Sequence, residues 1–435
     1  MKKVIYIILL FALVACEDQY ETTHKYSRLI YQSKDYPVYL DMSEISKIQV
    51  KSSVTAVAPF KIISNDHYYF VGDMMKGVHV YEKKGGYDVS YLCFIECKYL
   101  KAFDVVGNYL FCNNFIDLVV LDVSNPLQTS VRHREINHFN MFTSYAESWN
   151  IPYVEEKGCI VGSQQYTFSG IVTDQQPELD FSEYDQLYGN LTTTDIPDSW
   201  VSNHPENDKP YTGIIKVGDD KIYTYGKYLS WDICSYQGGI FMVTQKDFSN
   251  LTKGDYVPIS PSYSYVHPIK LLYKDEIIYV LYALNYSTTG STTGTFECMM
   301  PFESYTVQSW HSLYQPDYLS IDVTFNTSSN TIFVLTPHSI RTVTFSADNP
   351  YLHNYLEYEI LPGAVAITKA QDKLITIGNK LTVYNPTETD VHLVKEYSSI
   401  SGSCMLKDGN ILAVANQQGL FFYDISDLEN IKLVP

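Results

Sequence analysis

An all-β fold built from repeated four-stranded units is the structure that this sequence predicts, and three observations lead to it. Tyrosine is over-used, with 39 residues in a chain of 435, and Val, Ile, Thr and Phe are also frequent, which favours strands. Few segments repeat apolar residues with the 3.6-residue period of an amphipathic helix. A turn followed by a short apolar strand recurs about every 49 residues, which is the interval expected for a four-stranded repeat.

Each repeat begins with a turn that contains Asn, Asp or Gly, residues that tolerate a positive φ or close an Asx-turn. The strands after these turns start near residues 67, 108, 159, 221, 276, 331, 373 and 410. An apolar segment precedes most of the turns, as in FKIIS and IKLLY, and another follows, as in DLVVLDV and LFFYDIS. A fourth segment often comes next, as in VHLVKEY. The chain therefore repeats a unit of four antiparallel strands.

Two segments have similar sequences, LVVLDVSNP at 118–126 and GLFFYDISD at 419–427. The chain is similar to the LVIVD-repeat family, which is named for such a motif, and the similarity is partial at 77–83 and 239–250. This resemblance implies an extracellular β-propeller of largely unassigned function. Eight evenly spaced units predict eight blades, with seven as the alternative because the third unit lacks an obvious fourth strand. A sandwich of unrelated hairpins is a further alternative.

A ring of blades must close, because its first and last sheets would otherwise expose unpaired edges. Little follows the last LFFYDIS except IKLVP. The segment ISKIQVKSS at 45–53, before the first unit, alternates apolar and polar residues. We expect one or both of these segments to complete the final blade.

The N-terminus predicts export and lipidation. Two lysines precede an apolar stretch from Val4 to Ala15, which is typical of a signal peptide and too short to span a bilayer of about 30 Å. The residues LVAC resemble the bacterial lipobox, which implies cleavage before Cys16 and anchoring in the membrane by lipid on its sulfur and amino group. An ordinary secretory signal is the alternative. Glu17 and Asp18 resemble a surface-export signal, so we expect an outer-membrane lipoprotein on the cell surface, with the inner face of that membrane as the alternative.

The predicted domain organisation has three parts. Residues 1–15 are the signal peptide, 16–44 are the lipidated cysteine and a polar tether, and 45–435 are the propeller. The propeller carries an acidic insert at 173–210 after the third strand of the third unit. A long insertion into a repeat is a place where function is often found, and this one includes Trp200.

Two other long connections, at 228–238 and 283–294, lie between the second and third strands of neighbouring units. Equivalent loops of a propeller emerge on the same face, so Trp231, Asp232, Tyr236 and Tyr286 are expected to lie near one another. Exposed aromatic rings beside a carboxylate suit stacking on a sugar or contact with a protein partner. These four residues, with Trp200, are the candidate ligand-binding site. A Trp231 that only covers the edge of its blade is the alternative.

The composition and motifs weigh against other classes. The net charge of −18 would repel nucleic acid. The sequence contains no Gly-rich phosphate loop, no Gly-x-Ser-x-Gly and no His-Glu-x-x-His, so we expect no cofactor, no metal and no catalytic set of these kinds. Seven cysteines follow Cys16, and most are expected to be buried small hydrophobes. Cys93 and Cys97 would stand about 13 Å apart on one strand, beyond disulfide reach.

The sequence thus predicts a lipid-anchored envelope propeller that binds a glycan or an envelope protein. The alternative is a hydrolase or lyase that acts on extracellular polysaccharide, with carboxylates at the propeller axis. The strands expected to lie innermost carry few charged residues, which favours binding over catalysis. A structural scaffold without a ligand pocket is a third hypothesis.

Overall fold

The structure, a computed structural model, describes residues 26–434 with interruptions, and from 225 to 320 it describes the backbone alone. The segments outside the description are 86–87, 140–152, 155, 195–211, 218–220, 230–233, 243–251, 260–265, 275–276, 285–293, 304–305, 308–310, 315–320, 327–330, 346–352, 361 and 388–389. Strands dominate the rest, which confirms the all-β class with four-stranded antiparallel sheets. Among the helices of this part of the chain, none is both long and apolar enough to cross a membrane.

The chain divides into two compact units. One comprises Met1–Leu40 and Tyr153–Asp195, and we call it the ribbon unit. The other comprises Asp41–Pro152 and Ile196–Pro435, and we call it the seven-sheet unit. The second pass through the ribbon unit therefore lies, in sequence, between the second and third sheets of the seven-sheet unit.

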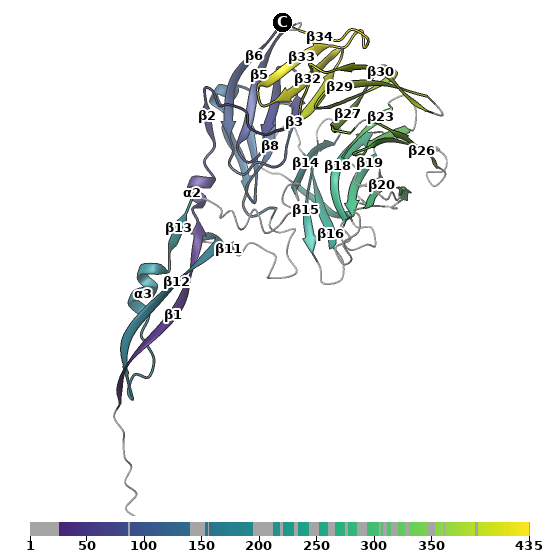
Figure 1. The fold of residues 1–435 in the computed structure, drawn as a ribbon. Helices are drawn as coiled ribbons and strands as arrows, with labels where there is room; N and C mark the ends of the chain where they lie inside the picture. Colours follow the sequence, from purple (N-terminus) through teal and green to yellow (C-terminus); the bar gives the residue numbers. More distant parts are fainter. Residues whose placement is uncertain are drawn as a thin grey trace, which may run out of the picture. The chain divides into compact units, whose positions relative to one another are not determined.

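In the seven-sheet unit, the described strands form seven sheets, each built on four consecutive strands that pair as an antiparallel meander (Figure 1). The first three sheets contain β3 (Pro59–Ser64), β4 (Tyr68–Asp73), β5 (Gly77–Gly85) and β6 (Asp88–Glu96); β7 (Phe103–Val106), β8 (Tyr109–Asn114), β9 (Asp117–Asp122) and β10 (Ser130–Glu135); β14 (Thr212–Val217), β15 (Lys221–Leu229), β16 (Cys234–Met242) and β17 (Thr252–Ile259). A short 3-10 helix, η1 (Pro126–Gln128), precedes β10.

The remaining four sheets repeat this order. They contain β18 (Val266–Lys274), β19 (Ile277–Leu284), β20 (Gly294–Glu303), β21 (Thr306–Val307) and β22 (His311–Tyr314); β23 (Asp322–Asn326), β24 (Thr331–Leu335), β25 (Ser339–Phe345) and β26 (His353–Glu359); β27 (Ala364–Ala370), β28 (Lys373–Gly378), β29 (Leu381–Pro386) and β30 (Val391–Tyr397); β31 (Cys404–Asp408), β32 (Ile411–Asn416), β33 (Gly419–Asp424) and β34 (Lys432–Leu433). Hence seven of the eight predicted turn-and-strand repeats begin the second strand of such a sheet.

Neighbouring sheets meet mainly through their first strands. The strand β3 contacts β7, and β7 contacts β14. The third and fourth sheets meet through β16 and β18, and the contacts then pass from β18 to β23, β27 and β31. Finally, β31 of the last sheet contacts β3 of the first. The series of contacts thus returns to the sheet where it began.

Of the two end segments, one or both of which are expected to complete the last blade, one joins the last sheet and the other does not. The strand β34, from IKLVP, is the fourth strand of the last sheet, as predicted. The segment 45–53 instead supplies β2 (Gln49–Lys51), a fifth strand on the first sheet beside β6. The physical reason is that Val50 packs on the apolar cluster between the first and second sheets and is half-buried there.

The first and last sheets share no strand in the described chain and are joined by side chains. The rings of Tyr69 and Phe422 have centroids 5.0 Å apart. Asp408 accepts hydrogen bonds from the Tyr69 hydroxyl and the Lys83 ammonium, each 2.9 Å long. Burial raises the pKa of Asp408, but these hydrogen bonds outweigh it, and the pKa is lowered overall.

The ribbon unit departs most from the prediction. Its long strands β1 (Ser27–Leu40) and β12 (Gly158–Thr173) lie side by side and antiparallel (Figure 1). The short β11 (Tyr153–Val154) pairs with β12, and β13 (Leu191–Thr193) pairs with β1. The expectation of a tether through residue 44 is therefore wrong from Ser27 onward, and the third repeat is not a blade but the start of β12.

Burial of one face explains why β1 and β12 form a ribbon. Tyr36 and Phe168 are only 3% and 8% exposed beneath α3 (Ser182–Tyr188), and Tyr166 stacks on Tyr188 with ring centroids 4.2 Å apart. The first part of the expected 173–210 insert is thus a folded cover for the ribbon, and its later part, with Trp200, lies outside the described residues. On the opposite face Tyr31 is 71% exposed.

Candidate functional site

Most of the site residues predicted from the sequence lie outside the described residues, namely Cys16, Trp200, Trp231, Asp232 and Tyr286. The structure nevertheless shows which strands are joined by the two connections that contain Trp231, Asp232 and Tyr286. Residues 230–233 join β15 to β16, and residues 285–293 join β19 to β20, so both link the second and third strands of consecutive sheets, as predicted. Tyr236 lies within β16 itself, opposite Lys227 and Ile259, and not in a loop.

These connections define one end of each sheet. In an antiparallel meander, the start of the first strand, the end of the second and the start of the third all lie at the same end of the sheet. We call this end the two–three face. In the first two sheets it includes the turn between β4 and β5, the turn between β8 and β9, and the segment 97–102 that leads from β6 to β7.

Three bulky residues on this face have left-handed backbones. Met75 has φ 67°, Tyr99 has φ 61° and Phe115 has φ 58°. Such a conformation is disfavoured for any residue with a Cβ and costs of order 1–3 kcal/mol. The three side chains are half-buried, and the rings of Tyr99 and Phe115 have centroids 5.5 Å apart. We call these three residues, two with aromatic rings and one methionine, the aromatic shelf.

The backbones of the shelf are tied to one another. The amide of Tyr99 donates to the carbonyl of Met75 (2.9 Å), and the amide of Met75 donates to the carbonyl of Leu100 (2.8 Å). A turn of the first sheet is thereby fixed to the segment that enters the second. Left-handed residues at functional sites persist where their surroundings fix them in this way.

Asn113 on β8 holds the other side of the shelf. This residue is 1% exposed, and its amide nitrogen donates to the carbonyls of Tyr99 (2.9 Å) and Phe115 (3.0 Å). Its amide oxygen accepts from the backbone amides of Lys101 (2.7 Å) and Ala102 (2.8 Å). One buried side chain therefore satisfies four backbone groups and fixes both aromatic residues.

Positive charge adjoins the shelf in a protein whose net charge is −18. Lys76 follows Met75 directly, and Lys98 and Lys101 flank Tyr99. Lys76 is exposed, and the other two are half-buried. This is an arrangement that can stack on a flat or apolar surface and attract negative charge next to it.

Two acidic groups at this end of the first two sheets are engaged inside the fold. Asp73 is fully buried and accepts hydrogen bonds from the backbone amides of Val57 (3.1 Å) and Ala58 (2.6 Å). Asp117 is 2% exposed and pairs with Arg134 at 2.8 Å. Their charges are compensated locally, so these two carboxylates do little to offset the positive charge of Lys76, Lys98 and Lys101.

The carboxylates of the first strands also have structural partners. The Lys61 ammonium lies 2.9 Å from the Asp104 carboxylate and donates to the carbonyl of Phe103 (2.7 Å), which joins the first and second sheets. Asp322 accepts from the backbone amide of Ile367 (2.8 Å), which joins the fifth and sixth sheets. Within the described part of the chain, no group of three or more His, Cys, Asp or Glu residues could hold a metal ion.

The aromatic shelf was missed by the sequence reasoning because that reasoning searched for long loops. The shelf is built from short turns that read as DMMKG, CKYLKA and NNFID. A positive φ is usually signalled by Gly or Asn, and these turns place Met, Tyr and Phe there instead. The paired asparagines at 113–114 are the one local signal, because buried asparagine commonly bonds to turn backbone.

No protein-family model and no curated protein matches this chain. Among solved structures, it is similar to a putative 6-phosphogluconolactonase from Bacteroides uniformis, at 12% identity and a TM-score of 0.36 over 51% of this chain and 69% of that one. It is also similar to Sqt1 from Saccharomyces cerevisiae, at 9% identity and a TM-score of 0.45 over 92% and 100%, and to the designed protein Ika8, at 8% and 0.44 over 92% and 90%. Likenesses this distant carry no argument about function.

Proposed function

We propose that the protein is a lipid-anchored β-propeller of the bacterial cell envelope that binds a glycan or an envelope protein on its two–three face. The seven-sheet unit would be a propeller of seven blades, the alternative count from the sequence. Seven meanders of four or more strands, with contacts that return from β31 to β3, support this architecture. The third of the eight predicted repeats is accounted for by β12 of the ribbon unit.

The observation that carries the binding proposal is the aromatic shelf. Strained bulky residues that a buried asparagine holds at a surface are costly for the fold, and such costs concentrate at functional sites. In a propeller the connections 230–233 and 285–293 emerge on the same face as the shelf. Trp231, Asp232 and Tyr286 would then extend the same binding surface, with Tyr236 at its margin.

The lysines beside the shelf favour partners that carry negative charge. A glycan with uronate or sulfate groups, or an acidic segment of a protein, would place its flat or apolar surface on Tyr99 and Phe115. Its charge would then lie near Lys76 and Lys98. Stacking supplies most of the affinity in such a site, and charge mainly sets the preference and the association rate.

The ribbon unit fits the role of a spacer. The strand β1 runs extended from Ser27 to Leu40, which separates its ends by about 43 Å at about 3.3 Å per residue. Residues 17–26 would connect it to lipid on Cys16, and Asp41 begins the seven-sheet unit. A paired strand with an aromatic core is far stiffer than a polar tether of the same length.

The proposal is tested by capture on immobilised residues 17–435 from envelope extract and from a panel of neutral and acidic glycans. One bait carries Tyr99→Ala and Phe115→Ala, and a second carries Trp231→Ala and Tyr286→Ala. Tyr31→Ala is the matched control, because Tyr31 is an exposed tyrosine of the ribbon unit. We expect the shelf bait to lose affinity by about 10- to 100-fold, corresponding to about 1.4–2.8 kcal/mol.

Equal capture by the shelf bait and the control would refute the shelf as the binding site. An enzyme is separated from a binding module by screening the same glycans for cleavage. Asp104→Asn and Asp322→Asn remove carboxylates of the first strands, where an axial active site would lie. Cleavage that either substitution abolishes would replace the binding proposal with the hydrolase or lyase.

A further inference from the structure

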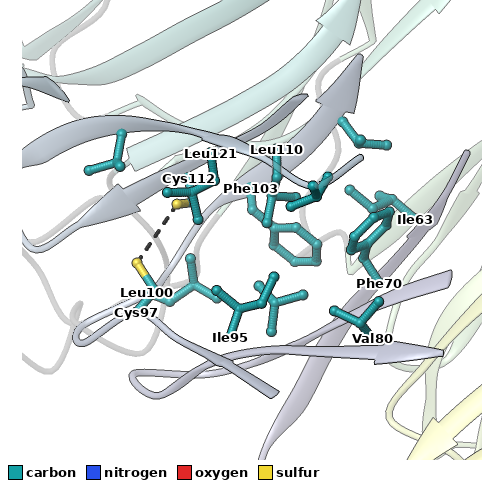
Figure 2. Packing of buried hydrophobic residues seen from close by; sticks show 14 of the residues in the cluster. Ile63, Phe70, Val80, Ile95, Cys97, Leu100, Phe103, Leu110, Cys112 and Leu121 are labelled. Carbon is teal, nitrogen blue, oxygen red and sulfur yellow. Dashed lines mark hydrogen bonds between the residues drawn. The ribbon is translucent and has the colours of Figure 1, made fainter. Parts of the chain in front are cut away.

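Two buried cysteines face each other beneath the aromatic shelf. Cys97 directly follows β6 of the first sheet, and Cys112 lies on β8 of the second. Both are fully buried, and their Sγ atoms are 3.7 Å apart (Figure 2). We propose that Cys97 and Cys112 form a disulfide that covalently joins the first and second sheets under the binding surface.

The surroundings of the pair favour a cross-link over a metal or a reactive thiol. The two sulfurs lie in an apolar cluster with Leu100, Leu110 and Leu121 (Figure 2). The thiol of Cys97 also donates to the carbonyl of Asn113 at 3.3 Å. Among the described residues, no group of three or more His, Cys, Asp or Glu could hold a metal ion, and both cysteines are fully buried, whereas reactive thiols are usually solvent-accessible.

The other cysteines with described side chains show that this contact is specific. Cys93, Cys159 and Cys404 are buried as well, but Cys93 donates to the carbonyl of Pro126, Cys159 lies on β12 of the ribbon unit, and Cys404 packs where the first and last sheets meet. Spacing along one strand rules out Cys93 as the partner of Cys97, as the sequence analysis found. The partner of Cys97 lies across the interface between sheets, where spacing along one strand gives no information.

Formation of the bond rests on the exported location in the proposed function, because disulfides persist in oxidising compartments. The oxidant would be the disulfide of a dithiol oxidoreductase. The thiolate of one cysteine attacks that disulfide and releases one oxidoreductase thiol. The second cysteine, as thiolate, then attacks the mixed disulfide and releases the other thiol. Two protons and two electrons pass from the pair to the oxidoreductase.

The fold indicates when this exchange takes place. The hydrogen bond to Cys112 and burial raise the pKa of Cys97 well above its usual value, so the folded protein keeps it as an unreactive thiol. Oxidation therefore belongs to a stage before the first and second sheets close on each other. Closing the bond to about 2.05 Å needs an approach of about 1.7 Å by the sulfurs, within the reach of small side-chain rotations.

The cross-link would act directly on the shelf. Tyr99 lies two residues after Cys97, and Phe115 lies three residues after Cys112. The disulfide would thus bind together the two segments that carry the rings of Tyr99 and Phe115, which are in contact. It supplements the hydrogen bonds of Asn113, and a site held in its bound conformation loses less entropy when a ligand arrives.

The test uses the full chain, expressed with its own signal and isolated from the envelope. The protein is denatured and alkylated before any reduction, then digested and analysed by mass spectrometry. We expect Cys97 and Cys112 to escape alkylation and to appear in one linked peptide pair, two hydrogens lighter than the two thiol peptides. Cys93 and Cys404 should be alkylated in the same sample. Full alkylation of Cys97 and Cys112 would overturn the proposal.

Variants make the result independent of folding yield. Cys97→Ser should expose Cys112 to alkylation, and Cys93→Ser should change nothing at either position. If Cys97→Ser does not accumulate, reductant should lower the melting temperature of the wild type and leave that of a Cys97→Ala, Cys112→Ala protein unchanged. An unaltered wild-type melting temperature contradicts the disulfide. A linked peptide without any captured partner would support the disulfide and contradict the proposed function. A captured partner without a linked peptide would support the proposed function and contradict the disulfide.

Discussion

Replacement of Asn113 by Ala should destabilise the seven-sheet unit more than its small size suggests. The side chain is 1% exposed and makes four hydrogen bonds to backbone groups, at 2.7, 2.8, 2.9 and 3.0 Å. Each buried bond of this kind contributes about 1 kcal/mol, and removal leaves its backbone partner unsatisfied. The expected loss is therefore about 4 kcal/mol in the free energy of unfolding.

Asn416→Ala is the matched control. Asn416 ends the second strand of the last sheet, is half-buried, and makes two side-chain hydrogen bonds, to the carbonyl of Ser401 and from the amide of Gln418. Water can replace these bonds, so its loss should be about 1 kcal/mol. Urea unfolding monitored by tyrosine and tryptophan fluorescence measures both, with the unfolding slope checked for change.

The difference between the stability losses of Asn113→Ala and Asn416→Ala tests whether Asn113 supports the shelf. A gap of about 3 kcal/mol supports the role of Asn113 as the support of the shelf. Equal losses, within about 0.5 kcal/mol, would show that these backbone groups find other partners. Asn113→Asp adds a second check, because a carboxylate would face the carbonyls of Tyr99 and Phe115 and should destabilise the unit at least as much as Ala.

Three further predictions follow from the described contacts. The folded-state pKa of Asp408 is lowered, so its stabilisation is present above its unfolded pKa of about 3.9 and is lost as pH falls through the folded pKa; Asp408→Asn should flatten the fall in melting temperature on acidification below about pH 5. Tyr99→Gly removes a ring but relieves the left-handed strain, so its melting temperature should stay near that of the wild type while captured ligand is lost. In the ribbon unit, Phe168→Ala should cost about 3–5 kcal/mol and Leu29→Ser less than about 0.5, measured by hydrogen exchange of β1 and β12.

Local patterns predicted much of the seven-sheet unit. A turn of Asn, Asp or Gly followed by strand-formers marks the hairpin between the first and second strands of all seven sheets. This signal is local, because both strands of a hairpin lie next to the turn that joins them. The closing strand from IKLVP was also predicted, since a final sheet with three strands would expose an edge.

The ribbon unit could not be read in the same way. The turn EKGCIVGSQ at 156–164 has the same local pattern as a blade hairpin, yet β12 pairs with β1, more than 120 residues earlier. Partners so far apart are set by burial across the whole fold and leave no local mark. Residues 27–35 have the polar composition of a tether because only one face of β1 is covered. That face carries Tyr36, which packs against the rings of Tyr166, Phe168 and Tyr188.

The shelf is a second feature that local sequence patterns do not predict. At Gly107 and Gly409 the chain uses glycine for φ values of 55° and 59°, and a Cβ there would meet open space. At Met75, Tyr99 and Phe115 it accepts nearly the same φ with large side chains. Turn geometry alone would be satisfied by glycine at lower cost. In the binding proposal these residues are kept for their side chains, which would contact the ligand, and the buried amide of Asn113 holds the backbones of Tyr99 and Phe115 in this conformation.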